Sequence, residues 1–307
     1  MSRGSELTLQ NPEYFEAVNK ITSTLLKSDH ATNDLTVITL GLSDAPATAT
    51  ILARDHGVLA GLEELTWLFQ SHGLETRTEK RDGDVMAPDD VLLRAEGPRS
   101  KLLSLERMGL NLLQRMSGIA TSAHNYCQRV RKTGSASEIV ATRKTHWGLL
   151  DKRAVHHGKG YTHRLGLGDA ILIKNNHLAL LANREEEAIR LAIQKAWPWR
   201  GRSAFIEVEV RCGRSALAAA DVFRRLQQEA GEQYPCFVML DNMKPPEITS
   251  ILDSLRKEHL WDHALIEISG GISESNIEDF AVCGADAISV GAITHSPRAI
   301  DLCERIS

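Results

Sequence analysis

Two patterns of apolar positions divide the chain. Residues 11–30 carry Phe15, Val18 and Ile21 at helical spacing, which predicts an amphipathic helix. Further segments predict strands over residues 36–41, 48–54 and 90–95 and helices over 61–70 and 100–132, the last with a possible break near Gly118. The first 117 residues therefore predict an α+β module.

The pattern changes after Gly134, where short apolar runs alternate with helical segments. The runs cover residues 138–142, 170–174, 205–210, 237–241, 265–269 and 287–290, and the helices cover 184–196, 215–230 and 245–257. Ser275 and Glu278 have the spacing of a capping box before a further helix. Near-continuous apolar strands that alternate with helices predict a parallel sheet covered by helices, either a barrel or a doubly wound sheet.

Charge is concentrated in one segment. The 307-residue chain has a net charge of −4, but residues 142–177 hold seven cations and two acids, a net +5, so the remainder carries −9. The same segment holds five of the twelve histidines. A compact basic segment in an acidic protein favours a small anionic ligand over a nucleic-acid surface.

Composition also bears on the compartment. The five cysteines are far apart and form no C-x-x-C pair, so we expect reduced thiols in a cytoplasmic protein. The first ten residues lack the apolar run of a signal peptide, and no apolar run reaches the roughly 18–20 residues of a membrane helix.

Polar residues follow the predicted strands. These residues are Thr142–Thr145, Lys174–His177, Glu207 and Glu209, Asp241–Asn242, Ser269–Gly271, and Gly291 with Thr294 and His295. Parallel α/β barrels build active sites at the carboxyl ends of their strands. An unpaired buried ammonium is costly, so we expect Lys174 to face a polar cleft. Glycine-rich strand ends suit phosphate, while Asp241 and the two glutamates could hold hydrated magnesium or sugar hydroxyls.

Plainer interpretations stay open for several of these residues. Arg143 and Lys144 could be solvated loop charges, and Glu207 could pair with a neighbouring arginine. Gly270-Gly271 alone is more often a turn than a phosphate loop. The adjacent His156 and His157 are more typical of a surface than of a metal site.

Several stretches together resemble the quinolinate phosphoribosyltransferase family. They are "DLTVITL", "ILARDHGVLAGLE", "EGPRSKLLSLERMGLNLLQRMSGIAT", "ATRKT", "THRLGLGDAILIKNNH", "IEVEV", "VMLDNM", "SGGI" and "ISVGAITHS", in the order of the family and over nearly the whole chain. The resemblance implies an N-terminal α/β sandwich domain over residues 1–117, an open parallel α/β barrel of the type II phosphoribosyltransferase kind over 118–295, and a helical tail over 296–307.

The resemblance also implies an activity. Quinolinate and phosphoribosyl pyrophosphate would give nicotinate mononucleotide, pyrophosphate and carbon dioxide, a step of NAD biosynthesis, with Mg²⁺ accompanying the pyrophosphate. It implies a homodimer or larger assembly in which the partner's N-terminal domain completes each active site, with no nucleic-acid or membrane partner.

Site residues carry over by matching position. Arg143, His163, Arg164 and Lys174 would line the quinolinate pocket, and Arg107 would reach it from the other subunit. Two substrate carboxylates would account for this density of cations. The phosphoribosyl pyrophosphate would contact Lys144 through its pyrophosphate, Glu209 and Asp241 through its ribose and magnesium, and Ser269, Gly270, Gly271 and Gly291 through its 5-phosphate, with His295 nearby. Lys144, Lys174, Glu209 and Asp241 would be the catalytic residues.

The chain departs from the family pattern at four places. These are the turn His146-Trp147-Gly148, the stretch Gly158-Lys159-Gly160, Asn175 in place of an aspartate, and a longer segment over residues 223–236. They leave substrate preference open. Three alternatives therefore remain: a relative that uses another aromatic acid such as nicotinate, a Schiff-base aldolase that uses Lys174, and a ligand sensor without catalysis.

Overall fold

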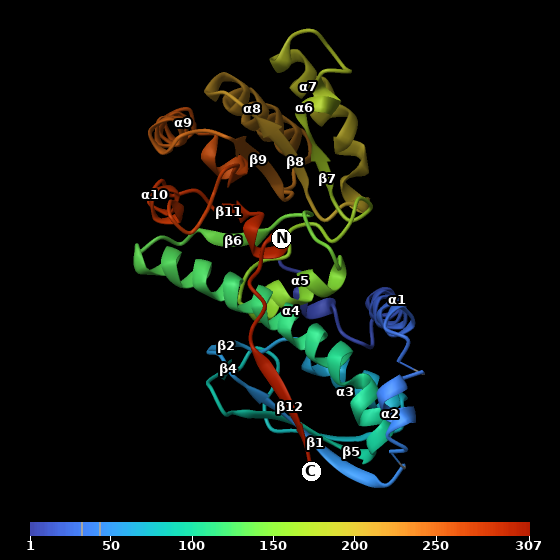
Figure 1. Cartoon of the computed structure of the whole chain (residues 1–307). Helices are drawn as coiled ribbons and strands as arrows, with labels where there is room; N and C mark the ends of the chain where they lie inside the picture. The colour runs from blue at the N-terminus through green and yellow to red at the C-terminus, as the bar shows by residue number, and fades with distance from the viewer. Residues whose placement is uncertain (32, 43) are drawn as a thin grey trace. The chain divides into compact units, whose positions relative to one another are not determined.

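The computed structural model describes residues 1–31, 33–42 and 44–307 (Figure 1). The chain forms two compact units that are interleaved in sequence. The barrel unit comprises Met1–Ser2, Tyr126–Lys144 and Tyr161–Ala292, and the sandwich unit comprises Arg3–Asn125, Thr145–Gly160 and Ile293–Ser307. The domain limits expected at residues 117 and 295 stay a prediction.

The barrel unit contains six parallel strands in the order β6-β11-β10-β9-β8-β7. Their bounds are β6 Glu138–Ala141, β7 Ile171–Ile173, β8 Ile206–Val210, β9 Cys236–Asp241, β10 Leu265–Ser269 and β11 Ala287–Val290. All six predicted apolar runs are thus confirmed as strands. In the described part of the chain the edge strands β6 and β7 do not pair with each other, which agrees with the expected open α/β barrel.

Helices cover the outside of these strands, as α7 to α10 show in Figure 1. The helices that begin in this unit are α6 Asn175–Leu178, α7 Glu185–Ala196, η2 Trp197–Arg202, α8 Gly213–Ala230, α9 Pro245–Lys257, η3 Trp261–His263, α10 Ile277–Ala281 and α11 Ala292–His295, of which α11 continues into the sandwich unit. The capping box expected at Ser275 is wrong. Asn276 is the N-cap of α10, and its side chain accepts a hydrogen bond from the Ser273 backbone N–H at 2.8 Å instead.

The sandwich unit contains an antiparallel sheet in the order β12-β1-β5-β3 and a short pair, β2-β4. The strands are β1 Pro46–Ala53, β2 Gly57–Val58, β3 Glu75–Thr78, β4 Val85–Met86, β5 Val91–Pro98 and β12 Leu302–Ile306. The helices that begin in this unit are η1 Gly4–Glu6, α1 Pro12–Ser28, α2 Leu35–Thr39, α3 Leu62–Ser71, α4 Arg99–Lys132 and α5 Leu149–His157.

Three sequence predictions for this unit are wrong. In place of the strand expected over residues 36–41, Leu35–Thr39 form helix α2, because the Asp34 carboxylate caps the N–H groups of Thr36 and Val37 at 2.9 and 3.2 Å. The expected helical tail ends in a strand, β12, which pairs with β1. Helix α4 runs unbroken through Gly118, where a Cβ would lie 2.2 Å from the Arg298 carbonyl oxygen. That glycine permits close packing rather than a break.

Candidate active site

Alternation along the barrel strands builds a cavity of about 530 Å³ at their carboxyl ends. Side chains two residues apart on a strand face the same side, so β8 directs Glu207 and Glu209 inward, and Arg211, the residue after β8, lines the same cavity. The cavity is lined by Thr142, Arg143, Lys144, His163, Arg164, Leu172, Lys174, Asn175, Asn176, Glu209, Arg211, Met239, Asp241, Glu267, Ser269 and Ser289. All of these residues belong to the barrel unit.

Eight of the residues predicted for the site line this cavity: Arg143, Lys144, His163, Arg164, Lys174, Glu209, Asp241 and Ser269. Gly270, Gly271 and Gly291 directly follow β10 and β11 but are not among the lining residues. Arg107 and His295 belong to the sandwich unit. Arg107 lies on α4 with a largely exposed side chain 3.7 Å from the Glu106 carboxylate, and His295 Nδ1 lies 2.6 Å from Ser296 Oγ.

The cations of the cavity are arranged to receive an anion. Lys174 is the N-cap of α6 and its side chain is exposed, so the strand does not bury its ammonium. Arg164 is buried and donates a hydrogen bond to the Ala170 carbonyl at 3.2 Å. Desolvation, together with the positive charge of Arg143, lowers the pKa of the Arg164 guanidinium. Two repelling guanidinium groups at one cavity favour an anionic partner.

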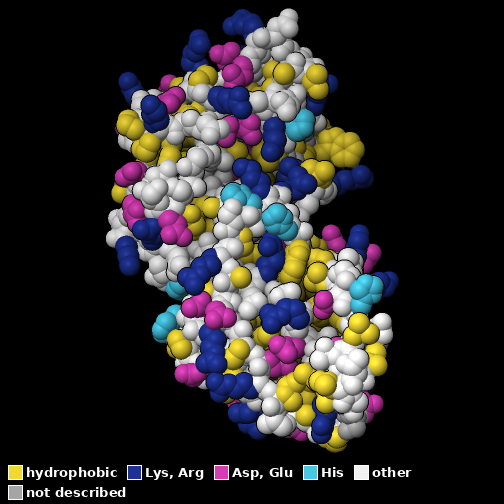
Figure 2. Space-filling model, in the orientation of Figure 1, with side chains coloured by type: hydrophobic (Ala, Val, Ile, Leu, Met, Phe, Trp, Pro, Cys, Tyr) yellow, Lys and Arg dark blue, Asp and Glu magenta, His cyan; other side chains and the backbone are white. Residues whose placement is uncertain are grey.

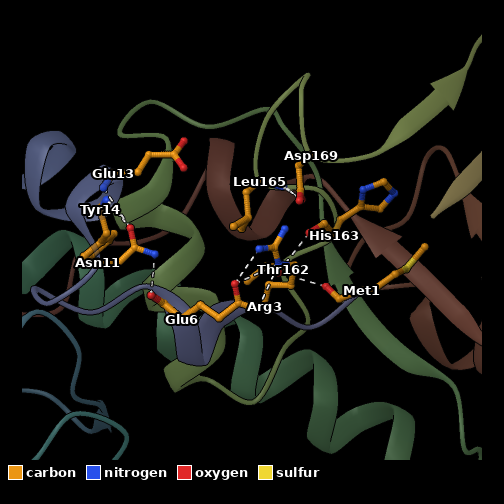
Figure 3. A network of polar contacts seen from close by, with 10 residues as sticks. All are labelled: Met1, Arg3, Glu6, Asn11, Glu13, Tyr14, Thr162, His163, Leu165 and Asp169. Atoms are coloured by element: carbon orange, nitrogen blue, oxygen red, sulfur yellow. Dashed lines mark hydrogen bonds and ion pairs between the residues drawn. The ribbon is translucent and has the colours of Figure 1, made fainter. Parts of the chain in front are cut away.

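Hydrogen bonds between side chains and backbone fix the loop that carries His163 and Arg164. The Thr162 hydroxyl donates to the Met1 carbonyl at 3.1 Å, and the Leu165 N–H donates to the Asp169 carboxylate at 2.7 Å (Figure 3). His163 has a φ of 56°, in the left-handed region that non-glycine residues rarely adopt. Such strain persists only where the surroundings hold it, and it concentrates at functional sites.

His163 lies between two fully buried carboxylates. Its Nε2 is 3.0 Å from Glu207 Oε2 and 3.5 Å from Glu267 Oε2, and the three side chains are 6%, 0% and 0% exposed. Glu207 therefore pairs with this histidine, whereas sequence reasoning expected hydrated magnesium, a sugar hydroxyl or an arginine as its partner. No other hydrogen-bond partner reaches either carboxylate within the described residues.

His163 and Glu207 hold their protons more tightly than usual. Desolvation lowers the pKa of His163, but the charges of Glu267 and Glu207 outweigh it and raise the pKa to about 9. Desolvation and the Glu267 charge raise the pKa of Glu207 to about 7. In the neutral ring, His163 Nδ1 accepts a hydrogen bond from the Arg164 N–H at 2.7 Å, which leaves the ring proton on Nε2, toward Glu207. A nitrogen that shares its proton with two acids is a poor ligand for magnesium, which prefers oxygen.

Two further carboxylates stand at the rim. Asn175 Nδ2 donates to Glu209 Oε1 at 2.8 Å, and Asn242 Nδ2 donates to Asp241 Oδ2 at 2.8 Å. Both carboxylates line the cavity, and their oxygens suit a hydrated magnesium ion that completes its shell with substrate oxygens. By donor chemistry, Glu209 and Asp241 fit this cation better than the buried trio does.

Glycine allows the ends of β9 and β10 to meet. Gly270 has a φ of 96°, and a Cβ there would lie 2.4 Å from Asn242 Oδ1 and 2.8 Å from the Asn242 backbone nitrogen. The Asn242 N–H donates to the Ser269 carbonyl at 2.9 Å. Gly271 also has a positive φ, of 65°. Position 270 therefore requires glycine, and position 271 has a backbone conformation that favours it.

The unusual turn after Lys144 is anchored within the sandwich unit. The Asp151 carboxylate, fully buried, accepts hydrogen bonds from the N–H groups of His146 and Trp147 at 3.0 and 3.1 Å. Arg115 binds the same carboxylate through two nitrogens at 3.0 and 2.8 Å, and its guanidinium lies 5.1 Å from the Trp147 ring centroid. This departure from the family pattern is thus a specifically held turn.

Sequence reasoning missed two features of the cavity and misplaced one histidine outside it. Glu267 is an acid inside the apolar run of β10, a signal that was available in the sequence. Arg211 continues the alternation of Glu207 and Glu209 by one step beyond β8. The expected surface position of His157 is wrong in part, because the ring is half-buried and its burial lowers its pKa to about 3.

Basic and acidic side chains are interspersed on the face shown in Figure 2, unlike the continuous basic stripe typical of nucleic-acid binders. Among the described residues, no helix combines the length and apolar character needed to cross a membrane. The barrel and its charged cavity define an enzyme-like anion-binding site at the carboxyl edge of an open α/β barrel.

Comparison with known proteins places this site in a family. The model of the quinolinate phosphoribosyl transferase C-terminal domain matches residues 119–303, and that of the N-terminal domain matches residues 34–117. The chain therefore belongs to the quinolinate phosphoribosyltransferase family, as its motifs suggested.

Individual relatives agree with this assignment. The chain is 35% identical over 280 residues to a probable nicotinate-nucleotide pyrophosphorylase (carboxylating) of Methanothermobacter thermautotrophicus, covering 91% of this chain and 95% of the relative. The corresponding enzyme of Rattus norvegicus is 31% identical, with 87% and 84% covered. The solved nicotinate-nucleotide pyrophosphorylase of Francisella tularensis superposes with a TM-score of 0.79 at 27% identity, with 95% and 96% covered.

Proposed function

We propose that this protein transfers the phosphoribosyl group of phosphoribosyl pyrophosphate to quinolinate, giving nicotinate mononucleotide, pyrophosphate and carbon dioxide. The cavity carries this proposal, because it joins cations suited to a dicarboxylate with two acids suited to a sugar and its metal. The named relatives support the same reaction, a step of NAD biosynthesis.

Arg143, His163, Arg164 and Lys174 are proposed to bind quinolinate. Arginine binds carboxylate through paired N–H groups, and four cationic or cation-capable side chains exceed what a monoacid such as nicotinate needs. The buried acids behind His163 fix its ring, so that one edge of the acid pocket is rigid. Arg107 of the partner subunit is proposed to complete the pocket in a homodimer or larger assembly.

The second substrate is proposed to lie across β8 to β11. Ser269, Gly270, Gly271 and Gly291 would hold the 5-phosphate through backbone N–H groups, with His295 nearby. Lys144 would contact the pyrophosphate, and Glu209 and Asp241 would face the ribose. Mg²⁺, held by Glu209 and Asp241, would neutralise charge on the pyrophosphate.

The residues then act by position and charge. As the bond from the ribose C1 to the pyrophosphate oxygen breaks, the sugar becomes cationic, and the carboxylates of Glu209 and Asp241 stabilise it while Lys144 stabilises the leaving group. The pyridine nitrogen attacks C1. The carboxylate beside that nitrogen then leaves as carbon dioxide, its bonding electrons remain on the ring carbon next to the positive nitrogen, and that carbon takes a proton.

A turnover assay tests the proposal. Purified protein, magnesium and phosphoribosyl pyrophosphate are mixed separately with quinolinate, nicotinate or nicotinamide, and mononucleotide and carbon dioxide are measured. Equal amounts of both products from quinolinate alone are expected. Product from nicotinate, or from none of the three, would contradict the proposal.

The Schiff-base alternative has less support. An imine-forming lysine needs a desolvated amine, whereas the Lys174 side chain is exposed beside other charged groups. Borohydride with a keto acid should therefore leave the mass of the protein unchanged. Formation of mononucleotide in the assay above would likewise exclude the alternative that this protein is a ligand sensor without catalytic activity.

A further inference from the structure

One cation of the cavity has no part in the scheme above. Arg211 follows the last residue of β8 and lines the cavity beside Asp241. Val210 pairs with Leu240 in the parallel register, so the next residues along the two strands, Arg211 and Asp241, stand side by side. Arg211 Nε lies 3.5 Å from Asp241 Oδ2.

This ion pair is easily exchanged. The Arg211 side chain is 62% exposed, whereas that of Asp241 is only 13% exposed. Because the Arg211 guanidinium is the exposed partner and lies at 3.5 Å, water screens its attraction to Asp241. Asp241 also keeps a hydrogen bond from Asn242 at 2.8 Å, so the carboxylate stays oriented when the arginine leaves. Arg211 can therefore leave Asp241 at small cost when another anion enters.

We propose that Arg211 binds the pyrophosphate end of phosphoribosyl pyrophosphate, exchanging the Asp241 carboxylate for the substrate's pyrophosphate oxygens. This inference rests on the proposed function. A guanidinium suits a diphosphate, because its planar array of N–H groups can donate two parallel hydrogen bonds to phosphate oxygens.

The position of Arg211 in the sheet favours the pyrophosphate as its ligand over the 5-phosphate and quinolinate. The glycine-rich strand ends proposed for the 5-phosphate belong to β10 and β11, and β9 separates them from β8. The loop that carries His163 and Arg164 precedes β7 in the chain, and Arg143 follows β6 at the other edge. Arg211 lies between these groups, next to both candidate magnesium carboxylates, where a magnesium-bound pyrophosphate would lie.

Direct binding tests the proposal without relying on turnover. Inorganic pyrophosphate, with and without magnesium, and quinolinate are titrated by calorimetry into wild type, Arg211→Ala, Arg211→Lys and Arg214→Ala. Arg214 is the matched control, because it lies three residues away on α8 with an 87% exposed side chain and does not line the cavity.

Arg211→Ala is expected to weaken pyrophosphate binding roughly tenfold and to change quinolinate binding less than twofold. Arg211→Lys should recover part of the loss, and Arg214→Ala should match wild type. Unchanged pyrophosphate affinity in Arg211→Ala would overturn the proposal, and so would a loss of quinolinate affinity instead. If wild type binds pyrophosphate through Arg211 but makes no mononucleotide, only the proposed function fails.

Discussion

The imidazole Nε2 of His163 lies 3.0 Å from Glu207 Oε2, and both side chains are almost completely excluded from water. Glu267 contributes a second carboxylate oxygen at 3.5 Å. A cavity proposed to bind a dianion therefore has two buried acids behind its cations. The imidazole lies between Glu207 and Glu267, and Glu267 itself lines the cavity.

The free energy of unfolding should depend on pH because His163 and Glu207 have different pKa values in the folded and unfolded chains. The folded-state pKa values of His163, about 9, and Glu207, about 7, both exceed ordinary values. Such groups stabilise the fold fully below their unfolded pKa values, and this contribution is lost as pH rises through the folded ones. We expect the free energy of unfolding in urea to fall between about pH 4.5 and 7 through Glu207 and between about pH 6.5 and 9 through His163. Glu207→Gln should reduce that fall by about 1–2 kcal/mol.

A matched control for this prediction is Glu247→Gln, which neutralises an exposed carboxylate in the first turn of α9. It should leave the pH dependence unchanged. An identical slope in Glu207→Gln and wild type would show that Glu207 and His163 are not coupled.

Arg143→Ala should change the KM for quinolinate much more than the KM for phosphoribosyl pyrophosphate. Loss of a charged hydrogen-bond donor to a carboxylate corresponds to about a 10- to 100-fold rise in the KM for quinolinate. The KM for phosphoribosyl pyrophosphate should change far less. Steady-state kinetics with each substrate varied in turn measures both values, and equal effects on the two would refute the assignment of Arg143 to the acid pocket.

Gly270→Ala should destabilise the barrel and weaken binding of phosphoribosyl pyrophosphate. The new Cβ would collide with Asn242, whose side-chain oxygen would be 2.4 Å away, in a backbone conformation with φ of 96°. A cost of about 2 kcal/mol is expected in urea unfolding. Gly166→Ala is the control, since nothing lies within 4 Å of its added Cβ and its φ is not positive. Equal stability of the two variants would argue against the close approach.

Asp151→Asn should loosen the turn after Lys144. The change leaves Arg115 with a neutral partner and weakens the acceptor for the N–H groups of His146 and Trp147. Disrupting a buried charge pair costs about 3 kcal/mol, which thermal unfolding will detect. Since Lys144 is proposed to stabilise the leaving pyrophosphate, kcat should fall more than KM for quinolinate rises. A stable variant with unchanged kcat would show that the turn does not position Lys144.

The sequence by itself determined the barrel strands and most of the cavity. The apolar runs ended where β10 and β11 end, because a strand buried on both faces must be apolar along its length. Residues such as Arg143, Lys174 and Asp241 were predictable, because parallel strands place their carboxyl ends at one edge.

Tertiary structure decided the rest. Leu302–Ile306 is a strand because β1 supplies its hydrogen-bonding partner, which no local pattern records. The pairs Glu207–His163, Asp241–Arg211 and Asp151–Arg115 join residues 30 or more positions apart. The strength of these pairs depends on the distance between the charges and on their burial. Neither can be read from the presence of a carboxylate in the sequence. Alternation could indicate which side chains share a face, but only folding determined which charges meet there.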